Sequence, residues 1–595
     1  MSDFEKGKSR CQVHFQKPLS HPAEGNGPID FAEYYRRNME KMVAYKNLLW
    51  EPKGTILITP PWNFPCSIPA GGILAALITG NVVLFKPASD VVLIGWHLAR
   101  AMWDAGVPKD VLQFIPCSGE TIGDMLIRDE RIKTVILTGG TSTALKFLQM
   151  RPNLDLAAET GGKNALIISA LADRDLAIKD LLQSAFGHSG QKCSAASLAI
   201  LEAEVYDDPN FMRQLREAAA SLKVGVAWEL DAKINPLIRE PRDVLLRGLT
   251  QLERGEEWLL EPKQDPRNSH LWSPGIKIGV QPNSFTHMTE LFGPVLAIMR
   301  AQHLEHAIDL ANAVPYGLTA GLHSLDEREQ AVWMEKIEAG NLYINRPITG
   351  AIVRRQPFGG TKASSFGNGS KAGGPNYLRE FLHVRQLSLP QEKHPVNEWV
   401  NSLTVFLEKI ELTAEQLGLW TASVANYAYW WKRMRQDRDP TKIIGQDNFF
   451  RYVPRKGIVL RVDYRAAPLD VLRICAAALT CGAELEVSWS SHKMKSSAFH
   501  WQQLVPILRV VEETNAQFLE RVKAGRFQRI RLVTAGDPDL YFAAATAGIR
   551  IIEQAVLANG RFELLHYLRE VAMSCDYHRY GNLGLREGEL RKQLL

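Results

Sequence analysis

Short apolar runs rich in β-branched residues alternate with longer helical patterns in the first part of the chain. The runs are GTILIT, NVVLF, VLQFI, TVIL and NALIIS, at residues 54–59, 81–85, 111–115, 134–137 and 164–169. Stretches of a length suited to helices separate them. This alternation predicts βαβ units and a doubly wound parallel sheet that binds its ligand at the carboxyl ends of the strands.

The same alternation continues beyond this first unit. A second α/β unit is expected to follow Glu159 and to end near Asn345. The polar, proline-containing segment 388–397 (SLPQEKHPVN) predicts a linker. Residues 457–552 then repeat the pattern with GIVLRV, PLDVLRICAAALTCG, AELEVSW, RIRLVT and GIRIIEQ. The tail therefore predicts a further α/β domain with a nucleotide-fold pattern, in which Cys475 and Cys481 are buried structural residues.

Composition and charge exclude several classes of protein. The 595 residues, 46% of them hydrophobic, suffice for roughly two to four domains. The longest apolar run, residues 68–85, is broken by glycines and an asparagine, so it predicts a buried helix and a strand, not a membrane span. A scattered net charge of +5 does not indicate a nucleic-acid-binding face. No signal peptide opens the chain, and seven cysteines without metal-ligand spacing predict reduced thiols, a cytoplasmic protein and no metal site.

Two glycine-bearing segments contain candidate catalytic residues. Glu159 lies in AETGGKNA (158–165), and Cys193 lies in GHSGQKCSA (187–195). A thiolate attacks a carbonyl carbon readily at neutral pH, and a carboxylate from another segment can take a proton from the thiol or from water. The pair therefore favours aldehyde oxidation or acyl transfer. Considered separately, the cysteine would more often be a buried hydrophobic residue and the glutamate a surface carboxylate.

These motifs resemble the aldehyde dehydrogenase superfamily, in which Glu-x-Gly-Gly-Lys and Gly-Gln-Lys-Cys elements have this separation. The motifs PPWNFP, LFKPAS, ILTGG, ELFGPV and NRPITGAIVRRQPFGG occur in the order that the family uses. The stretch 345–375 resembles the branch that oxidises glutamate semialdehyde, the Δ1-pyrroline-5-carboxylate dehydrogenases of proline catabolism. The chain is also similar to the dehydrogenase part of the bifunctional proline utilization A flavoproteins, in their longer form with an extra C-terminal domain.

The resemblance implies an α/β aldehyde dehydrogenase fold, with a Rossmann-like cofactor domain and an α/β catalytic domain, followed by a degenerate dehydrogenase-like α/β domain. The implied boundaries are 1–158 for the NAD-binding domain, 159–345 for the catalytic domain, 346–395 for the substrate anchor loop and return segment, and 396–595 for the C-terminal domain. Family members carry a long stretch before the position of Ile29, so the NAD-binding domain is expected to be N-terminally incomplete. A homo-oligomer is also expected.

The resemblance assigns catalytic roles to three residues. Cys193 is the expected nucleophile, and Glu159 is the expected base that activates the deacylating water. The side-chain amide of Asn63 and the backbone N–H of Cys193 are the expected donors to the oxyanion. Lys192 and Ser194 flank the nucleophile and are expected to contact the substrate. Lys192 could lower the thiol pKa, attract a substrate carboxylate, or be a solvated loop charge.

The cofactor residues also follow from the resemblance, since no GxGxxG motif follows the first strand. Lys86 is expected to reach the adenosine ribose, and Ser89 stands where many NAD-specific relatives carry a glutamate that excludes a 2′-phosphate. Glu290 and Phe292 are expected to hold the nicotinamide ribose and ring. The glycines expected to open helices toward the pyrophosphate are Gly119, Gly123, Gly139 and Gly140. NAD is the expected cofactor, and NADP stays open.

Substrate choice is expected to depend on the loop after Phe358. Ser364, matched by counting from PFGG, and Gly367 resemble the segment that grips the amino acid end of glutamate semialdehyde, while a flexible Gly/Ser loop is the other interpretation. The expected reaction is the NAD-dependent oxidation of L-glutamate γ-semialdehyde to L-glutamate. A proline dehydrogenase, on another chain or in a missing N-terminal region, would supply the substrate. The alternatives are an inactive or split-partner remnant of a bifunctional protein, and a dehydrogenase for another semialdehyde such as that of succinate.

Overall fold

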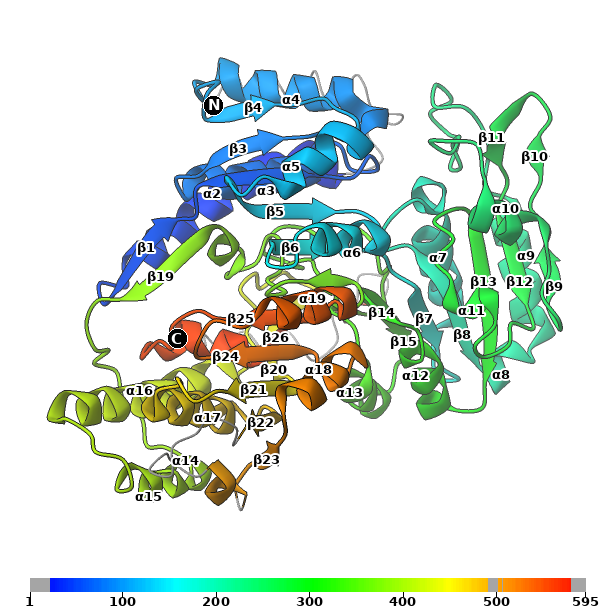
Figure 1. The fold of residues 1–595 in the computed structure, drawn as a ribbon. Coiled ribbons are helices and arrows are strands. Elements are labelled where there is room, and N and C mark those ends of the chain that lie inside the picture. The colour runs from blue at the N-terminus through cyan, green and yellow to red at the C-terminus, as the bar shows by residue number, and fades with distance from the viewer. Residues whose placement is uncertain (1–21, 491–500, 506, 579–595) are drawn as a thin grey trace.

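A computed structural model of the chain describes residues 22–490, 501–505 and 507–578 (Figure 1). Residues 1–21 of the expected NAD-binding domain and 579–595 of the expected C-terminal domain lie outside this description. Three large sheets, of six, nine and five strands, organise the described residues. The long helix α2 (Pro22–Val43) packs on α3 (Ser67–Ile78) beside the first sheet.

The six-stranded sheet has the strand order β18-β6-β5-β2-β3-β4. Its parallel strands are β2 (Thr55–Thr59), β3 (Val82–Phe85), β4 (Leu112–Phe114), β5 (Ile132–Thr138) and β6 (Asp155–Glu159). The connecting helices are α3, α4 (Val92–Asp104), α5 (Asp124–Arg128) and α6 (Thr141–Met150). The short β18 (Ser365–Phe366) pairs antiparallel with β6. The apolar run 68–85 thus forms a helix and a strand, as its glycines indicated.

The nine-stranded sheet has the order β20-β26-β16-β15-β7-β8-β13-β12-β9. Its catalytic-domain strands are β7 (Asn164–Ile168), β8 (Ala196–Glu202), β9 (Glu257–Leu260), β12 (Gly275–Ile278), β13 (Val295–Ala301), β15 (Thr319–His323) and β16 (Asn341–Ile344). Helices of this unit include α7 (Arg174–Phe186), α9 (Pro209–Ala220), α10 (Asp243–Thr250), α12 (Leu304–Asn312) and α13 (Glu327–Lys336). The central strands β7 and β15 are buried at every position, as expected where helices cover both faces.

Two strands from the tail of the chain complete this sheet. β26 (Leu568–Asp576) runs parallel to β16, and β20 (Gln446–Pro454) pairs antiparallel with β26. The sequence placed both segments in a C-terminal domain that begins at residue 396, whereas the structure adds them to the catalytic sheet. The physical reason is that β16 would otherwise present an unpaired edge, and β26 satisfies its backbone groups.

The five-stranded sheet has the order β23-β22-β21-β24-β25, all parallel. Its strands are β21 (Ile458–Val462), β22 (Leu485–Trp489), β23 (Arg509–Glu512), β24 (Arg529–Leu532) and β25 (Arg550–Ile552). Its main helices are α16 (Ala414–Met434), α17 (Pro468–Cys481), α18 (Asn515–Lys523) and α19 (Pro538–Ala547). The order repeats that of β4-β3-β2-β5-β6 in the first sheet, with the earliest strand at the centre.

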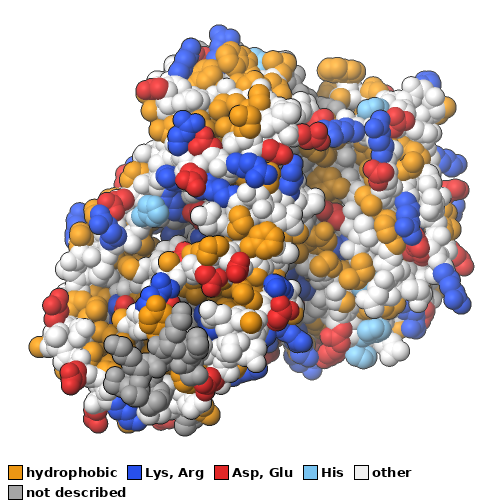
Figure 2. Space-filling view, in the orientation of Figure 1, with side chains coloured by type: hydrophobic (Ala, Val, Ile, Leu, Met, Phe, Trp, Pro, Cys, Tyr) orange, Lys and Arg blue, Asp and Glu red, His pale blue; other side chains and the backbone are white. Residues whose placement is uncertain are grey.

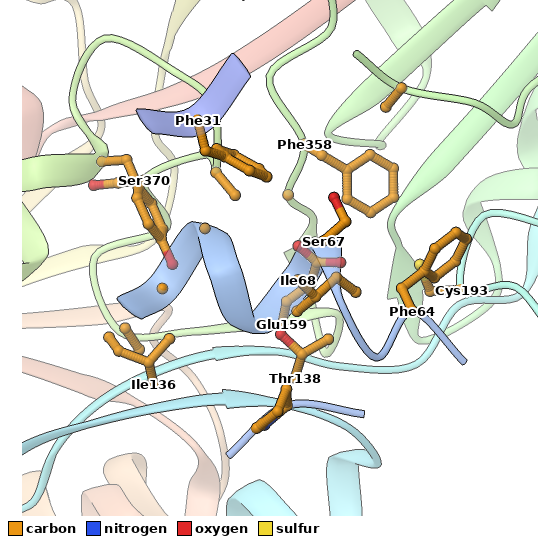
Figure 3. A pocket seen from close by; sticks show the side chains of 18 of the residues that line it. Phe31, Phe64, Ser67, Ile68, Ile136, Thr138, Glu159, Cys193, Phe358 and Ser370 are labelled. Carbon is orange, nitrogen blue, oxygen red and sulfur yellow. The ribbon is translucent and has the colours of Figure 1, made fainter. Parts of the chain in front are cut away.

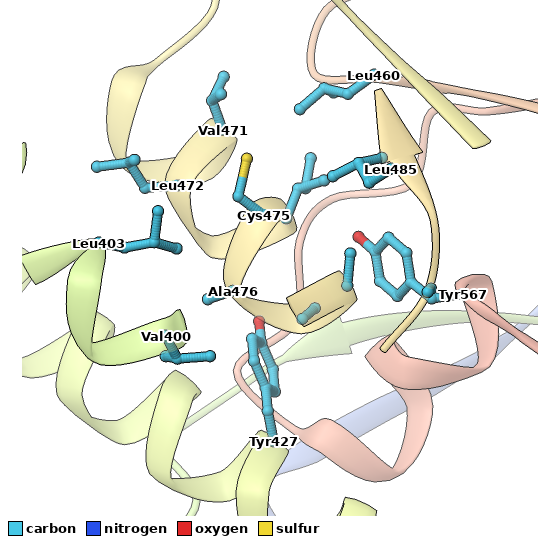
Figure 4. Close-up of a cluster of buried hydrophobic side chains, with 14 of the residues drawn as sticks. Val400, Leu403, Tyr427, Leu460, Val471, Leu472, Cys475, Ala476, Leu485 and Tyr567 are labelled. Carbon is cyan, nitrogen blue, oxygen red and sulfur yellow. The ribbon is translucent and has the colours of Figure 1, made fainter. Parts of the chain in front are cut away.

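The C-terminal core packs on both sides of α17. Cys475 of α17 is buried beside Leu472, Leu460 and Leu485, with Tyr427 of α16 below it (Figure 4). Cys481 is also buried in this helix, so both thiols are part of the packing. Segment 388–397, between β19 (Leu382–Gln386) and α14 (Glu398–Ser402), contains no helix or strand.

The outer surface carries charges of both signs. Figure 2 shows lysine and arginine side chains interspersed with aspartate and glutamate over the visible face. Within the part of the chain that the structure describes, no helix combines the length and the hydrophobicity that a bilayer span requires.

Candidate active site

A cavity of about 540 Å³ lies between the first sheet, helix α3 and the segment 350–372 (Figure 3). Cys193, Ser194 and Glu159 all line this cavity. In Figure 3, Cys193 lies at one end beside Phe64, and Ser370 marks the other end. The structure therefore brings the expected nucleophile and base to one cavity, although Glu159 ends a strand of the first sheet and Cys193 lies in a loop of the catalytic unit. Among the described residues, no cluster of three or more side chains suited to a metal ion occurs.

Glu159 is the last residue of β6, at the carboxyl end of the sheet. Its backbone pairs with Ser365 of β18, and its carbonyl oxygen accepts a hydrogen bond from the N–H of Gly139 at 3.1 Å. Burial raises the pKa of its carboxyl to about 7, and the nearby Lys371 ammonium opposes this shift. Glu159 can therefore gain or lose a proton near neutral pH.

Cys193 lies in the loop between α7 and β8. Burial raises the pKa of its thiol well above the usual range, and the charges of Glu159 and Glu290 add to the effect. The resting thiol is therefore protonated and needs a base before it can attack. Asn164 fixes the loop, because its side-chain amide donates to the carbonyl oxygens of Cys193 at 2.7 Å and of Ala195 at 2.9 Å.

The turn between β2 and α3 joins the cofactor sheet to this loop. Asn63, 6% exposed, donates from its side-chain amide to the carbonyl oxygen of Gln191 at 3.1 Å, so it lies beside the segment that carries Cys193. The two aromatic neighbours of Asn63 also reach the catalytic domain. The rings of Trp62 and Phe292 meet edge to face, with their centroids 5.7 Å apart, and Phe64 stacks on His188, with the ring centroids 5.9 Å apart.

Glycines allow the site segments to approach one another closely. Gly190 has a φ of +71°, and a Cβ there would lie 2.2 Å from the carbonyl oxygen of Gly293. A Cβ on Gly162 would lie 2.9 Å from the carbonyl oxygen of Cys193. The N–H of Gly162 also donates to the Glu290 carboxylate at 2.8 Å, and burial raises the pKa of that carboxyl to about 7. The motifs around Glu159, Cys193 and Glu290 thus share one packed centre.

Six of the expected cofactor residues lie after the carboxyl ends of neighbouring strands of the first sheet. Lys86 and Ser89 follow β3, the pair Gly119 and Gly123 follows β4, and the pair Gly139 and Gly140 follows β5. The Lys86 side chain lies against the segment after β4, because a Cβ on Gly123 would be 3.6 Å from the Cε of Lys86. Gly140 is the N-cap of α6 and offers backbone N–H groups without a side chain in front of them.

Lys192 is buried, with 7% of its surface exposed, so the interpretation of a solvated loop charge is wrong. Burial lowers the pKa of its ammonium to about 8, while the adjacent Cys193 opposes the shift. Lys192 does not line the cavity, whereas its neighbour Ser194 does. A role of Lys192 in substrate contact stays a prediction.

Ser364 and Gly367, which are expected to grip the substrate, do not line the cavity. Ser364 is fully buried, and its hydroxyl donates to the Gly161 carbonyl at 2.6 Å and accepts from the Gly317 N–H at 3.0 Å. A Cβ on Gly367 would lie 2.3 Å from the carbonyl oxygen of Leu156, so this glycine packs against β6. Both residues hold the site segments together instead.

One wall of the cavity comes from the segment that ends in the PFGG motif. Residues 350–353 and Phe358 line the cavity, and both lie in NRPITGAIVRRQPFGG. Gly350 has a φ of +84°, and a Cβ there would meet no atom within 4 Å, so its backbone is open to the cavity. The segment before PFGG thus lines the cavity, whereas Ser364 and Gly367 after it do not.

Comparison with known proteins agrees with this geometry. Residues 29–387 match the aldehyde dehydrogenase family over more than half of the chain. The chain belongs to the aldehyde dehydrogenase family. A 1-pyrroline-5-carboxylate dehydrogenase from a Geobacillus species is 35% identical over 376 residues, which cover 60% of this chain and 72% of that relative.

This aldehyde dehydrogenase is also similar in structure to two solved proteins. Proline utilization A (PutA) from Corynebacterium freiburgense is 36% identical and matches 98% of this chain with a TM-score of 0.84. The chain spans 56% of the length of that protein. A 1-pyrroline-5-carboxylate dehydrogenase from Thermus with bound NAD is 31% identical, with a TM-score of 0.59 over 64% of this chain and 78% of its own. The expected fold, with its extra C-terminal α/β region, is confirmed.

Proposed function

We propose that this aldehyde dehydrogenase oxidises L-glutamate γ-semialdehyde, the open-chain form of Δ1-pyrroline-5-carboxylate, to L-glutamate with NAD. The observation that carries the proposal is the meeting of Cys193 and Glu159 in one cavity, next to the strand ends that bear the expected cofactor glycines. The names of the Geobacillus and Thermus relatives support the choice of substrate.

The reaction begins at the Cys193 thiol. Its sulfur attacks the aldehyde carbon, and because the resting thiol is protonated, a base must take the proton. Glu159, with a pKa of about 7, is the proposed acceptor. The amide of Asn63 and the backbone N–H of Cys193 are the proposed donors to the oxygen of the thiohemiacetal.

NAD, when bound, would accept the hydride that leaves the thiohemiacetal carbon. Lys86, Ser89, Glu290 and Phe292 would hold it together with the four glycines Gly119, Gly123, Gly139 and Gly140. These residues fit such a ligand, because a Cβ on Gly119 would meet no atom within 4 Å and Gly140 opens α6 without a side chain.

Loss of the hydride leaves a thioester on Cys193. Glu159 first releases the thiol proton to solvent, and it then takes a proton from water as the water oxygen attacks the thioester carbon. The carbon–sulfur bond then breaks, glutamate leaves, and the sulfur recovers this second proton from Glu159. We place the amino acid end of the substrate against residues 350–353, where Gly350 exposes its backbone to the cavity.

The substrate would come from the oxidation of proline. We propose that a proline dehydrogenase supplies it, either on another chain or in a longer form of this protein, because the chain spans 56% of the PutA relative. Assembly into a homo-oligomer is part of the same proposal.

The test follows NADH formation by absorbance with pyrroline-5-carboxylate, for the wild-type chain and for Cys193→Ala. We expect turnover that the substitution abolishes, a preference for NAD over NADP, and a lower kcat/KM for succinate semialdehyde. A folded wild-type chain without turnover would favour the inactive or split-partner alternative. Preference for succinate semialdehyde would retain the enzyme and change its substrate.

A further inference from the structure

The loop 346–356 forms one wall of the catalytic cavity, but the bonds that hold it come largely from the tail of the chain. Residues 350–353, Arg355 and Gln356 line the cavity. The three polar side chains that anchor the loop reach β20, β26 and the turn before β20. They are Arg346, Arg354 and Gln356.

Gln356 connects the loop to itself and to the tail. It is 2% exposed, and its side-chain oxygen accepts from the N–H of Ile352 at 3.1 Å, which closes the loop. Its side-chain nitrogen donates to Asn448 of β20 at 2.5 Å and to the hydroxyl of Ser574 of β26 at 3.2 Å. One amide therefore couples the shape of the loop to both tail strands.

Ser574 is the centre of this network and is fully buried. Its hydroxyl accepts from the guanidinium of Arg346 at the start of the loop and from Gln356 at its end. The same hydroxyl donates to the Asn448 side-chain oxygen at 2.8 Å. Arg346 also lies 3.4 Å from the Asp576 carboxylate, while Arg354 donates to the Pro440 carbonyl at 2.5 Å.

We propose that Ser574 is a positioning residue for substrate recognition, which holds the loop 346–356 in the shape that accepts the amino acid end of the aldehyde. The proposal rests on the proposed function for the identity of that aldehyde. Ser574 touches neither Cys193 nor the cavity, so it acts through the loop alone. With this role, the tail of the chain does more than cover the edge of β16, because it also shapes the loop that selects the substrate.

The geometry predicts how removal of the hydroxyl acts. Ser574→Ala removes the acceptor that Arg346 and Gln356 share. Gln356 keeps its bond to Asn448 and Arg346 keeps its contact with Asp576, so each side chain loses one of its buried bonds, and this loss loosens the loop. Nothing in the change alters the nucleophile or the cofactor residues. Thr480→Val is a matched control, because Thr480 is also buried in the tail and its hydroxyl donates only within α17, to Ala476 at 2.7 Å.

The kinetic test compares wild type, Ser574→Ala and Thr480→Val with pyrroline-5-carboxylate and with propanal, which lacks the amino acid end. For Ser574→Ala we expect the KM for pyrroline-5-carboxylate to rise about tenfold, as for a lost hydrogen bond to a buried partner, with kcat and the kcat/KM for propanal within about twofold. Thr480→Val should match wild type. An unchanged KM, or an equal loss with both aldehydes, would overturn the proposal.

A second measurement is independent of the substrate. Hydrogen exchange followed by mass spectrometry should show faster exchange for residues 346–356 in Ser574→Ala than in wild type or Thr480→Val. Unchanged exchange of residues 346–356 in a folded variant would contradict the proposal that Ser574 holds the loop. A wild-type chain that ignores pyrroline-5-carboxylate would contradict the proposed function, and the exchange result would still decide whether Ser574 holds the loop.

Discussion

The side-chain amide of Asn164 donates to the carbonyl oxygen of Cys193 at 2.7 Å. Asn164 also donates to the carbonyl oxygen of Ala195, and its own side-chain oxygen accepts from the N–H of Thr319 at 3.0 Å. One side chain of β7 thus fixes the loop of the nucleophile and ties it to β15. The orientation of the thiol depends on an amide that is not itself in the cavity lining.

Asn164→Asp should lower kcat by about tenfold or more, because aspartate keeps the acceptor for Thr319 but loses both donors and places charge beside two carbonyl oxygens. The measurement is steady-state turnover together with the midpoint of thermal unfolding. Asn312→Asp is the control, since Asn312 also bridges a carbonyl and an N–H, in Lys336 and Glu338, but far from the loop. Equal effects of the two substitutions would contradict a specific role.

Glu159→Gln should slow both thiol attack and the release of glutamate. Glutamine can take a proton neither from the Cys193 thiol nor from water, so we expect turnover at least about a hundredfold slower and no burst of NADH. In wild type, the deacylation rate should increase with pH through about 7, where the buried carboxyl loses its proton. Rapid-mixing absorbance measurements at several pH values test both points. A retained burst of about one NADH per site, followed by slow turnover, would mean that another base serves the thiol.

The same substitution should stabilise the fold at alkaline pH. Burial holds the folded pKa of Glu159 near 7, above its ordinary value of 4.5, so its favourable contribution to folding is complete below pH 4.5 and is lost as the pH rises through 7. We expect Glu159→Gln to exceed wild type in unfolding free energy by about 1–2 kcal/mol at about pH 8, and by less at about pH 5. Denaturant unfolding at both pH values measures this. Glu335→Gln, on the exposed face of α13, should show no such trend.

Gly190→Ala should destabilise the chain by roughly 3 kcal/mol or more, because its Cβ would lie 2.2 Å from the carbonyl oxygen of Gly293. Gly482→Ala separates this contact from backbone strain. Gly482 has a φ of +72°, close to the +71° of Gly190, but a Cβ there meets no atom within 4 Å. We expect the control to lose about 1–2 kcal/mol and to keep full activity. Similar losses in both variants would mean that the loop around Gly293 yields easily.

Local patterns in the sequence predicted the parts of the fold that local chemistry determines. The apolar runs at 54–59 and 81–85 became β2 and β3, because short β-branched runs between helices favour buried parallel strands. The residues of the motifs around Cys193 and Glu159 converge on one cavity. That convergence followed from the family resemblance, since nothing in either segment alone specifies its partner.

The roles of Ser364 and Asn164 depend on contacts between segments that are distant along the chain, so local patterns did not predict them. Ser364 resembles a flexible-loop serine in the sequence, yet its hydroxyl is used by Gly161 and Gly317, which are distant along the chain. Asn164 appears as one polar residue at the start of an apolar strand, and its role depends on a loop that returns only after α7. Neither partnership leaves a local signal in composition or periodicity.

The pairing of β26 with β16 has a consequence for how this chain can be divided. Composition places a boundary between two units in segment 388–397. A cut there would remove β26, the strand that pairs with the backbone of β16 (Asn341–Ile344). All four residues of β16 are buried, so the fragment would expose an apolar strand edge and would tend to aggregate. The catalytic unit is therefore discontinuous in the chain, and any exchange of modules between relatives would have to carry 446–454 and 568–576 along with the dehydrogenase.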